Sequence, residues 1–125
     1  MTRVRTAAVA VFGLRVAYGV ALIAAPAKIT RSWLGPAVDG DPTQVALRGL
    51  GGREVLLHGF GIAAALRGKP LLPWLVISMS GDLTDIAATF AGSRGIPDDA
   101  PKKTAFVAGG SAALTAAVLA AELTG

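Results

Sequence analysis

The sequence predicts an all-α membrane protein, an antiparallel bundle of four transmembrane helices with an interfacial segment between the first and the second. Composition indicates the class: 53% of the 125 residues are hydrophobic and 16% are charged, against about 25% charged residues in soluble domains. Four apolar stretches, each about 20 residues long, indicate the spans, because a helix of that length crosses the hydrocarbon core. We therefore expect one integral membrane domain, residues 1–125.

The first span is expected from Thr6 to Ala25, with Arg15 near its middle. A cleaved signal peptide is the alternative, because a basic segment precedes the apolar run and Ala25-Pro26-Ala27 resembles a cleavage site. An arginine in the centre of the run argues against it, and the run is long for a signal peptide. We expect a membrane helix that Pro26 closes.

The segment 28–40 mixes apolar and polar residues, and we expect an interfacial linker along the headgroup layer. The second span is expected at residues 42–67, with Asp41 as its N-cap and Pro42 at its first helical position. A tight turn at Gly68-Lys69-Pro70 leads to the third span, residues 71–91.

The fourth span is expected at residues 102–123 and is rich in small residues. They recur at every fourth position, as Ala105, Gly109, Ala113, Ala117 and Ala121. Because such a pattern lets helix backbones approach closely, it predicts a helix-packing interface. Basic residues are densest in the shortest segments, namely Arg3, Arg5, Arg67 and Lys69, which favours cytoplasmic termini in a multi-pass protein of the inner (plasma) membrane.

Charged residues lie inside the expected spans, where a charge at the bilayer centre costs about 2.5 to 3.5 kcal/mol unless it finds a partner or water. They are Arg15, Arg48, Arg53, Glu54, Asp82 and Asp85, and their charges sum to zero. The midpoints of the first three spans fall near Arg15, Glu54 and Asp82, so we expect these three at one depth. We expect Arg48 and Asp85 to pair in one leaflet, with Arg53 between the two layers.

Helical periodicity predicts that these charges share an inward face. One stripe on the third span is Ser78, Asp82, Asp85 and Thr89, and a matching stripe on the second span is Leu47, Gly51, Glu54 and His58. Glu54 and His58 are four residues apart and can touch. Gly49, Gly51 and Gly52 leave room beside them for another helix or a ligand.

The charge cluster, with His58, has three interpretations. Buried ion pairs that fix helix register are favoured, and a proton or ion pathway is the second. The third is an enzyme acting on lipid headgroups, because the segment 81–85 has the D-x-x-D with which the motif of the CDP-alcohol phosphotransferases begins. That resemblance implies a divalent cation on a pyrophosphate, but Ile86 stands where the family has glycine and no later aspartate pair follows.

Several classes of site are excluded by the residues present. Cysteine is absent and His58 is the only histidine, so one chain holds no thiolate or multi-histidine metal site. No nucleotide-binding or hydrolase motif occurs. The basic residues form no stripe, which argues against nucleic acid and favours anionic lipid headgroups. We expect no cofactor, no metal and no catalytic residue.

Four features carry a resemblance to a known group of proteins: the Arg15 span ending in Ala-Ala-Pro, the segment Trp33-Leu34-Gly35, the segment 48–54, and Trp74 followed by two aspartates. The chain resembles the small four-span membrane proteins of unknown function found in actinobacteria. The resemblance implies the fold and no chemistry.

Function is expected to be that of a non-catalytic accessory subunit of a larger inner-membrane complex, because the loops are short and the fourth span offers an interface. A lipid-import transporter is the preferred complex, with other integral membrane subunits and membrane lipids as partners. The alternative is a small carrier or proton-coupled channel that assembles as a homo-oligomer.

Overall fold

The computed structural model describes residues 1–125, and it contains helices and no strands, as predicted. Its four long helices are α1 (Arg3–Ala24), α3 (Asp41–Leu66), α4 (Leu72–Ala91) and α5 (Ala100–Thr124). A short helix, α2 (Pro26–Leu34), lies between α1 and α3 and continues into a 3-10 helix, Gly35–Asp39. A second 3-10 helix, Ser93–Gly95, precedes α5.

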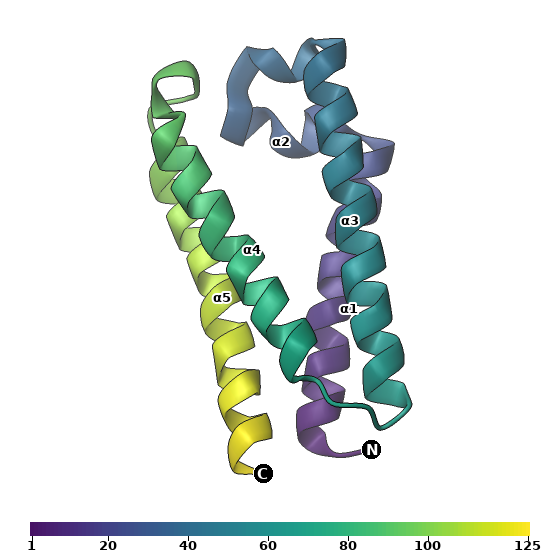
Figure 1. Ribbon diagram of the computed structural model, residues 1–125. Coiled ribbons are helices and arrows are strands. Elements are labelled where there is room, and N and C mark those ends of the chain that lie inside the picture. Colours follow the sequence, from purple (N-terminus) through teal and green to yellow (C-terminus); the bar gives the residue numbers. More distant parts are fainter.

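The long helices associate as two pairs, α1 with α3 and α4 with α5 (Figure 1). The pairs approach each other at the end that carries both termini and diverge toward the other end, where α2 lies (Figure 1). We call these the closed end and the open end. Because the long helices alternate in direction, the α3–α4 turn lies with the termini at the closed end.

The boundaries of α3 follow the expected signals with one correction. Gly40 is extended, with φ −79° and ψ 138°, so Asp41 is the first helical residue rather than the N-cap, and no side chain caps the helix. At the other end, the Lys69 N–H donates to the Ala64 carbonyl at 2.9 Å. Gly68 takes the left-handed conformation, φ +67°, that this type of helix end requires.

The segment expected as an interfacial linker, residues 28–40, is mostly helical. Pro26 ends α1 and also starts α2, since proline fits the first position of a helix. The Arg31 guanidinium donates two hydrogen bonds, of 2.7 and 3.1 Å, to the Asp39 carboxylate. Trp33 donates its indole N–H to Thr89 of α4 at 2.9 Å, so tertiary contact holds α2 in place.

Two helices, α1 and α5, are long and apolar enough to cross a membrane. The sequence predicted four such spans. The other two long helices have comparable lengths, 26 residues for α3 and 20 for α4. They carry the charged residues of the predicted stripes, which lower their hydropathy.

Close packing between α1 and α3 depends on glycine. A Cβ atom on Gly51 would lie 2.6 Å from the Gly19 carbonyl oxygen, and one on Gly19 would lie 2.7 Å from the Gly51 carbonyl oxygen. The Phe12 ring covers Gly61, where a Cβ atom would lie 2.8 Å from it. Each helix therefore presents backbone where a side chain would separate the pair.

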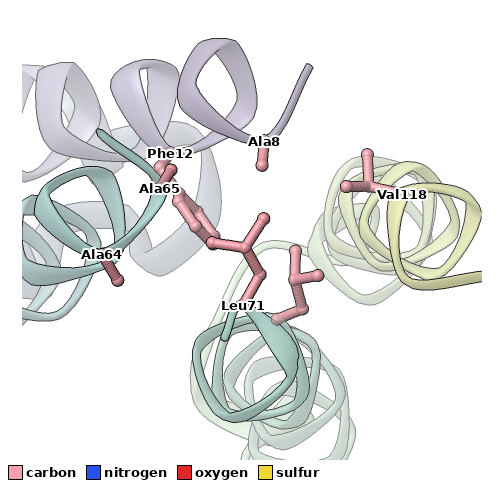
Figure 2. Packing of buried hydrophobic residues seen from close by; sticks show 7 residues of the cluster. Ala8, Phe12, Ala64, Ala65, Leu71 and Val118 are labelled. Carbon is pink, nitrogen blue, oxygen red and sulfur yellow. The ribbon is translucent and has the colours of Figure 1, made fainter. Parts of the chain in front are cut away.

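A hydrophobic cluster fills the closed end, with side chains from all four long helices or their first turns (Figure 2). Its members are Ala8, Phe12, Ala64, Ala65, Leu71, Leu75 and Val118. Arg5 lies beside it and donates to the carbonyl oxygens of Ala65 at 3.2 Å and Lys69 at 2.9 Å. The same guanidinium is 3.8 Å from Glu122 of α5, so one side chain ties three elements together.

Candidate functional site

Arg15, in the middle of α1, is the centre of a polar cluster that joins all four long helices. Its Nε and Nη2 atoms donate to the two carboxylate oxygens of Glu54 at 3.1 and 3.2 Å. Its Nη1 atom donates to Asp82 of α4 and, at 2.8 Å, to Ser111 of α5. The structure therefore brings together the three residues that the span midpoints placed at one depth. Ser111 is a partner that sequence reasoning missed.

The predicted inward stripes form. Leu47, Gly51, Glu54 and His58 are all buried on α3, and Ser78, Asp82 and Thr89 are buried on α4, with Asp85 half-buried beside them. The spacing of three and four residues was sufficient to identify these faces.

The predicted pair of Arg48 and Asp85 does not form. Arg48 is exposed, and its Nε donates to the Ile23 carbonyl at the end of α1, 3.2 Å away. Arg53 is also exposed, and it makes no ion pair. Arg53 precedes Glu54 in the chain, and adjacent residues of a helix point about 100° apart, so Arg53 does not share the inward face of Glu54. The prediction that six mutually balancing charges share the interior is therefore wrong, because Arg48 and Arg53 lie outside it.

His58 extends the cluster toward the closed end. Its Nδ1 faces the Glu54 backbone carbonyl at 2.9 Å and the Glu54 carboxylate at 3.2 Å. Both are acceptors, so Nδ1 donates, and Nε2 forms a hydrogen bond with the Ser78 hydroxyl at 2.8 Å. The Phe12 ring lies against the imidazole, with 5.6 Å between centroids. The polar chain thus ends at the hydrophobic cluster.

A cavity of about 330 Å³ lies on the other side of Arg15, between the two helix pairs and beneath α2. Its inner wall has Arg15, Asp82, Asp85 and Ser111. Tyr18 and Trp33 supply aromatic surface, and Ile29, Val107 and Ala108 supply aliphatic surface. Ser32, Lys103 and Thr104 complete the lining. The cavity joins the polar cluster to the open end.

Two carboxylates at this cavity lack the partners that buried charges need. Asp82 is 3% exposed, and its second oxygen, Oδ2, has no hydrogen-bond partner. The Asp85 carboxylate takes part in no ion pair, and only its backbone carbonyl accepts a hydrogen bond, from Thr89 at 2.6 Å. One guanidinium therefore faces three carboxylates, those of Glu54, Asp82 and Asp85. The interior cluster therefore contains more carboxyl groups than guanidinium groups.

Lys103, at the edge of the cavity, does not compensate this charge. Its ammonium lies 2.9 Å from Asp99, one helical turn away, and both side chains are more than half exposed. Its hydrogen bond holds the pKa of Asp99 below its usual range, and this carboxyl stays charged. Lys103 is thus paired outside the cavity.

The small-residue stripe of α5 lies mostly outside the bundle. Ala113 and Ala117 are exposed, while Ala105, Gly109 and Ala121 are half-buried. The buried face of this helix is a different one, made of Ala108, Ala112, Thr115 and Val118 with Ala100. The stripe therefore does not pack the helices of this chain together.

Asp82 and Asp85 share the cavity wall, but no group of three or more carboxylate or histidine side chains is arranged to hold a metal ion.

Comparisons of the chain with protein-family models, with curated proteins and with solved structures find no match.

Proposed function

We propose that the chain is a four-span inner-membrane carrier whose interior site takes up a positively charged group, either a proton or a cationic solute. The excess of carboxyl groups over arginine at the cavity carries this proposal. Ion pairs that only fix helix register would be balanced, whereas here one arginine faces three carboxylates. A low-dielectric interior favours uptake of positive charge by such a group.

The exposed surface supports a membrane location. Only 22% of the most apolar window of α1, and the same share for α5, is buried within the chain. Large hydrophobic side chains such as Leu14 on α1 and Phe106 on α5 are 71% and 83% exposed. A core helix of a soluble protein would hide such residues. Lipid is the environment that matches this surface.

Pairing of charges supports the crossing of α3 and α4 as well. Glu54 and His58 of α3 and Asp82 of α4 all face the interior, where Arg15 and Ser78 bind them. Lipid would therefore not meet these carboxylates or the imidazole, whereas Arg48 and Arg53 of α3 are exposed. Both helices have the length that a span needs.

Access from one side supports a carrier over an open channel. The cavity reaches Arg15 from the open end. Beyond Ser78 the hydrophobic cluster of Phe12, Leu71 and Leu75 leaves no continuous polar path. A carrier exposes its site to one side at a time. With only four spans, we expect the functional unit to be a homo-oligomer.

Labelling of single cysteines tests the four-span topology, because the chain has no cysteine of its own. Thr2→Cys, Lys69→Cys and Ser93→Cys each place one thiol at an exposed position. Four spans put Thr2 and Lys69 on one side, which we expect to be the cytoplasm, and Ser93 on the other. Labelling of Lys69→Cys together with Ser93→Cys would instead indicate that only α1 and α5 cross.

Proton uptake into proteoliposomes tests the carrier. A dye inside the vesicles reports uptake driven by a membrane potential, and we expect a rate above that of protein-free vesicles. Asp85→Asn should reduce it to that background, whereas Asp98→Asn, in the exposed loop before α5, should leave it unchanged. Normal uptake by Asp85→Asn would contradict the proposal. Failure of both Asp82→Asn and Asp85→Asn to accumulate would favour a purely structural cluster.

An accessory subunit is the second candidate, and the exposed face of α5 favours it. Ala113 and Ala117 are small and exposed on the outer face of α5, where a helix of another subunit could approach closely. A lipid-import complex in an actinobacterial membrane is the form of this candidate that the sequence resemblance suggests.

A further inference from the structure

We propose that the cavity binds the ammonium group of an amphiphilic cation and that the apolar tail of this ligand leaves between α1 and α5 into the surrounding lipid. This inference rests on the carrier proposed above and names the class of its ligand. It depends on three features of the lining: two incompletely paired carboxylates, two aromatic side chains, and an apolar rim that is open on the outside of the bundle.

The carboxylates define the charge of the ligand. Asp82 is almost completely buried and leaves Oδ2 without a partner, and Asp85, one turn further along α4, has a free carboxylate. Arg15 already uses four N–H groups on Glu54, Asp82 and Ser111. It therefore has little capacity left to bind an anion. A positively charged donor in the cavity would pair with Asp85, and Asp82 lies on the same wall.

The aromatic residues favour an organic cation over a metal ion. Tyr18 of α1 and Trp33 of α2 both line the cavity. The face of an aromatic ring attracts an ammonium group, and such contacts strengthen when water is excluded. The volume of about 330 Å³ accommodates a headgroup of several heavy atoms.

The apolar rim of the cavity indicates that the ligand has a hydrocarbon tail. Tyr18 and Ile29 are each 40% exposed and Val107 is 69% exposed, although all three line the cavity. They come from α1, α2 and α5, so the cavity opens sideways between α1 and α5 through an apolar rim. In a bilayer this opening meets acyl chains. A ligand that enters there would have a hydrocarbon chain attached to its charge.

Fluorescence of Trp33 tests the inference in the full-length protein in non-ionic detergent. Trp74→Phe leaves Trp33 as the only tryptophan, since the chain has two. Decylammonium is titrated into this protein. Decanol is the control ligand without a charge, and methylammonium is the control ligand without a hydrocarbon tail. We expect a saturable change with decylammonium, and binding at least about tenfold weaker for both control ligands, because each lacks one of the two contacts.

Asp85→Asn is the decisive variant because its carboxylate has no partner, so its loss leaves the packing intact. We expect it to weaken decylammonium binding at least about tenfold, as loss of a desolvated charge partner does. Asp98→Asn is the matched control and should bind as the parent does. Equal binding of decanol, equal binding of methylammonium, or full affinity of Asp85→Asn would each overturn the inference.

Competition with phosphatidylethanolamine identifies the source of the ammonium group. Displacement of decylammonium supports the inference with a lipid headgroup as ligand, and its absence supports it with a free amphiphile. The result is separable from the carrier itself. Absence of decylammonium binding with Asp85-dependent proton uptake retained would refute only the ligand class. Loss of both would refute the carrier as well.

Discussion

Arg15 of α1 and Asp82 of α4 form an ion pair that connects the two helix pairs at the middle of the molecule. The opposite edge of the same guanidinium holds Glu54 of α3 through two hydrogen bonds. Arg15 is thus both the only cation of the interior cluster and the residue that sets the distance between the pairs.

Replacement of Arg15 should therefore destabilise the protein strongly. Arg15→Leu leaves two carboxylates without their partner, and removal of one member of a buried ion pair costs about 3 to 5 kcal/mol. Arg15→Lys keeps the charge but loses the two-pronged contact with Glu54, so an intermediate effect is expected. Thermal unfolding in detergent measures both. A melting temperature for Arg15→Leu equal to that of the parent would contradict the role assigned to this residue.

Gly51 should tolerate no side chain, in contrast to its neighbour Gly52. Gly51→Ala places a methyl group 2.6 Å from the Gly19 carbonyl oxygen, whereas the same change at Gly52 meets nothing within 4 Å. We expect Gly51→Ala to destabilise by about 1 to 3 kcal/mol, as overpacking does. Gly52→Ala should be neutral, or stabilising by up to about 1 kcal/mol through helix propensity. Unfolding in a denaturing detergent compares the two, and equal stability would disprove the close approach of α1 and α3.

Ala113 and Ala117 test whether the outer face of α5 binds another subunit. Both are exposed, so the double variant Ala113→Leu/Ala117→Leu should fold like the parent but lose any partner that packs there. Ala112→Leu is the control for folding, because Ala112 is buried and a larger side chain should destabilise by about 1 to 3 kcal/mol. Purification in mild detergent with identification of bound proteins gives the readout. An unchanged set of bound proteins for the double variant would exclude this face as the interface.

Acid should loosen the segment that covers the cavity. The hydrogen bond from Arg31 holds the pKa of Asp39 below its usual range. A lowered folded-state pKa means that the contact stabilises above the ordinary carboxyl range, near pH 4, and is lost as pH falls through the lower folded value. Emission of Trp33 should change over that interval in Trp74→Phe. Adding Asp39→Asn should flatten the change, and a persistent transition would assign it to another group.

The sequence was sufficient for the long helices and the depth of their charges. Glu54 and Asp82 lie opposite Arg15 because antiparallel spans of similar length align their midpoints, and the spacing of Ser78, Asp82 and Thr89 identifies an inward face. The angle between adjacent helical residues would also have shown that Arg53 does not face the interior, which a count of charges could not show. Arg53 is adjacent to Glu54, and adjacent residues of a helix point about 100° apart.

Other features depend on tertiary contacts that no local pattern carries. The helix α2 is held by Trp33 against Thr89, 56 positions later in the chain. Arg5 was counted only as a basic residue of the first segment, yet it binds one backbone carbonyl at the end of α3 and one in the α3–α4 turn. The splaying of the two helix pairs follows from direct contacts between the long helices at the closed end and from α2 lying between the pairs at the open end.

Arg5 connects the two helix pairs at the closed end of the molecule. It belongs to the pair of α1 and α3 and reaches Glu122 of the other pair. At the open end the two pairs are connected through α2, whose Trp33 donates to Thr89 of α4. A 25-residue helix is about 37 Å long, so a rotation of about 5° at the joint moves the tip by about 3 Å. A small rotation around Arg5 would therefore be amplified at the open end, where Trp33 of α2 donates to Thr89 of α4.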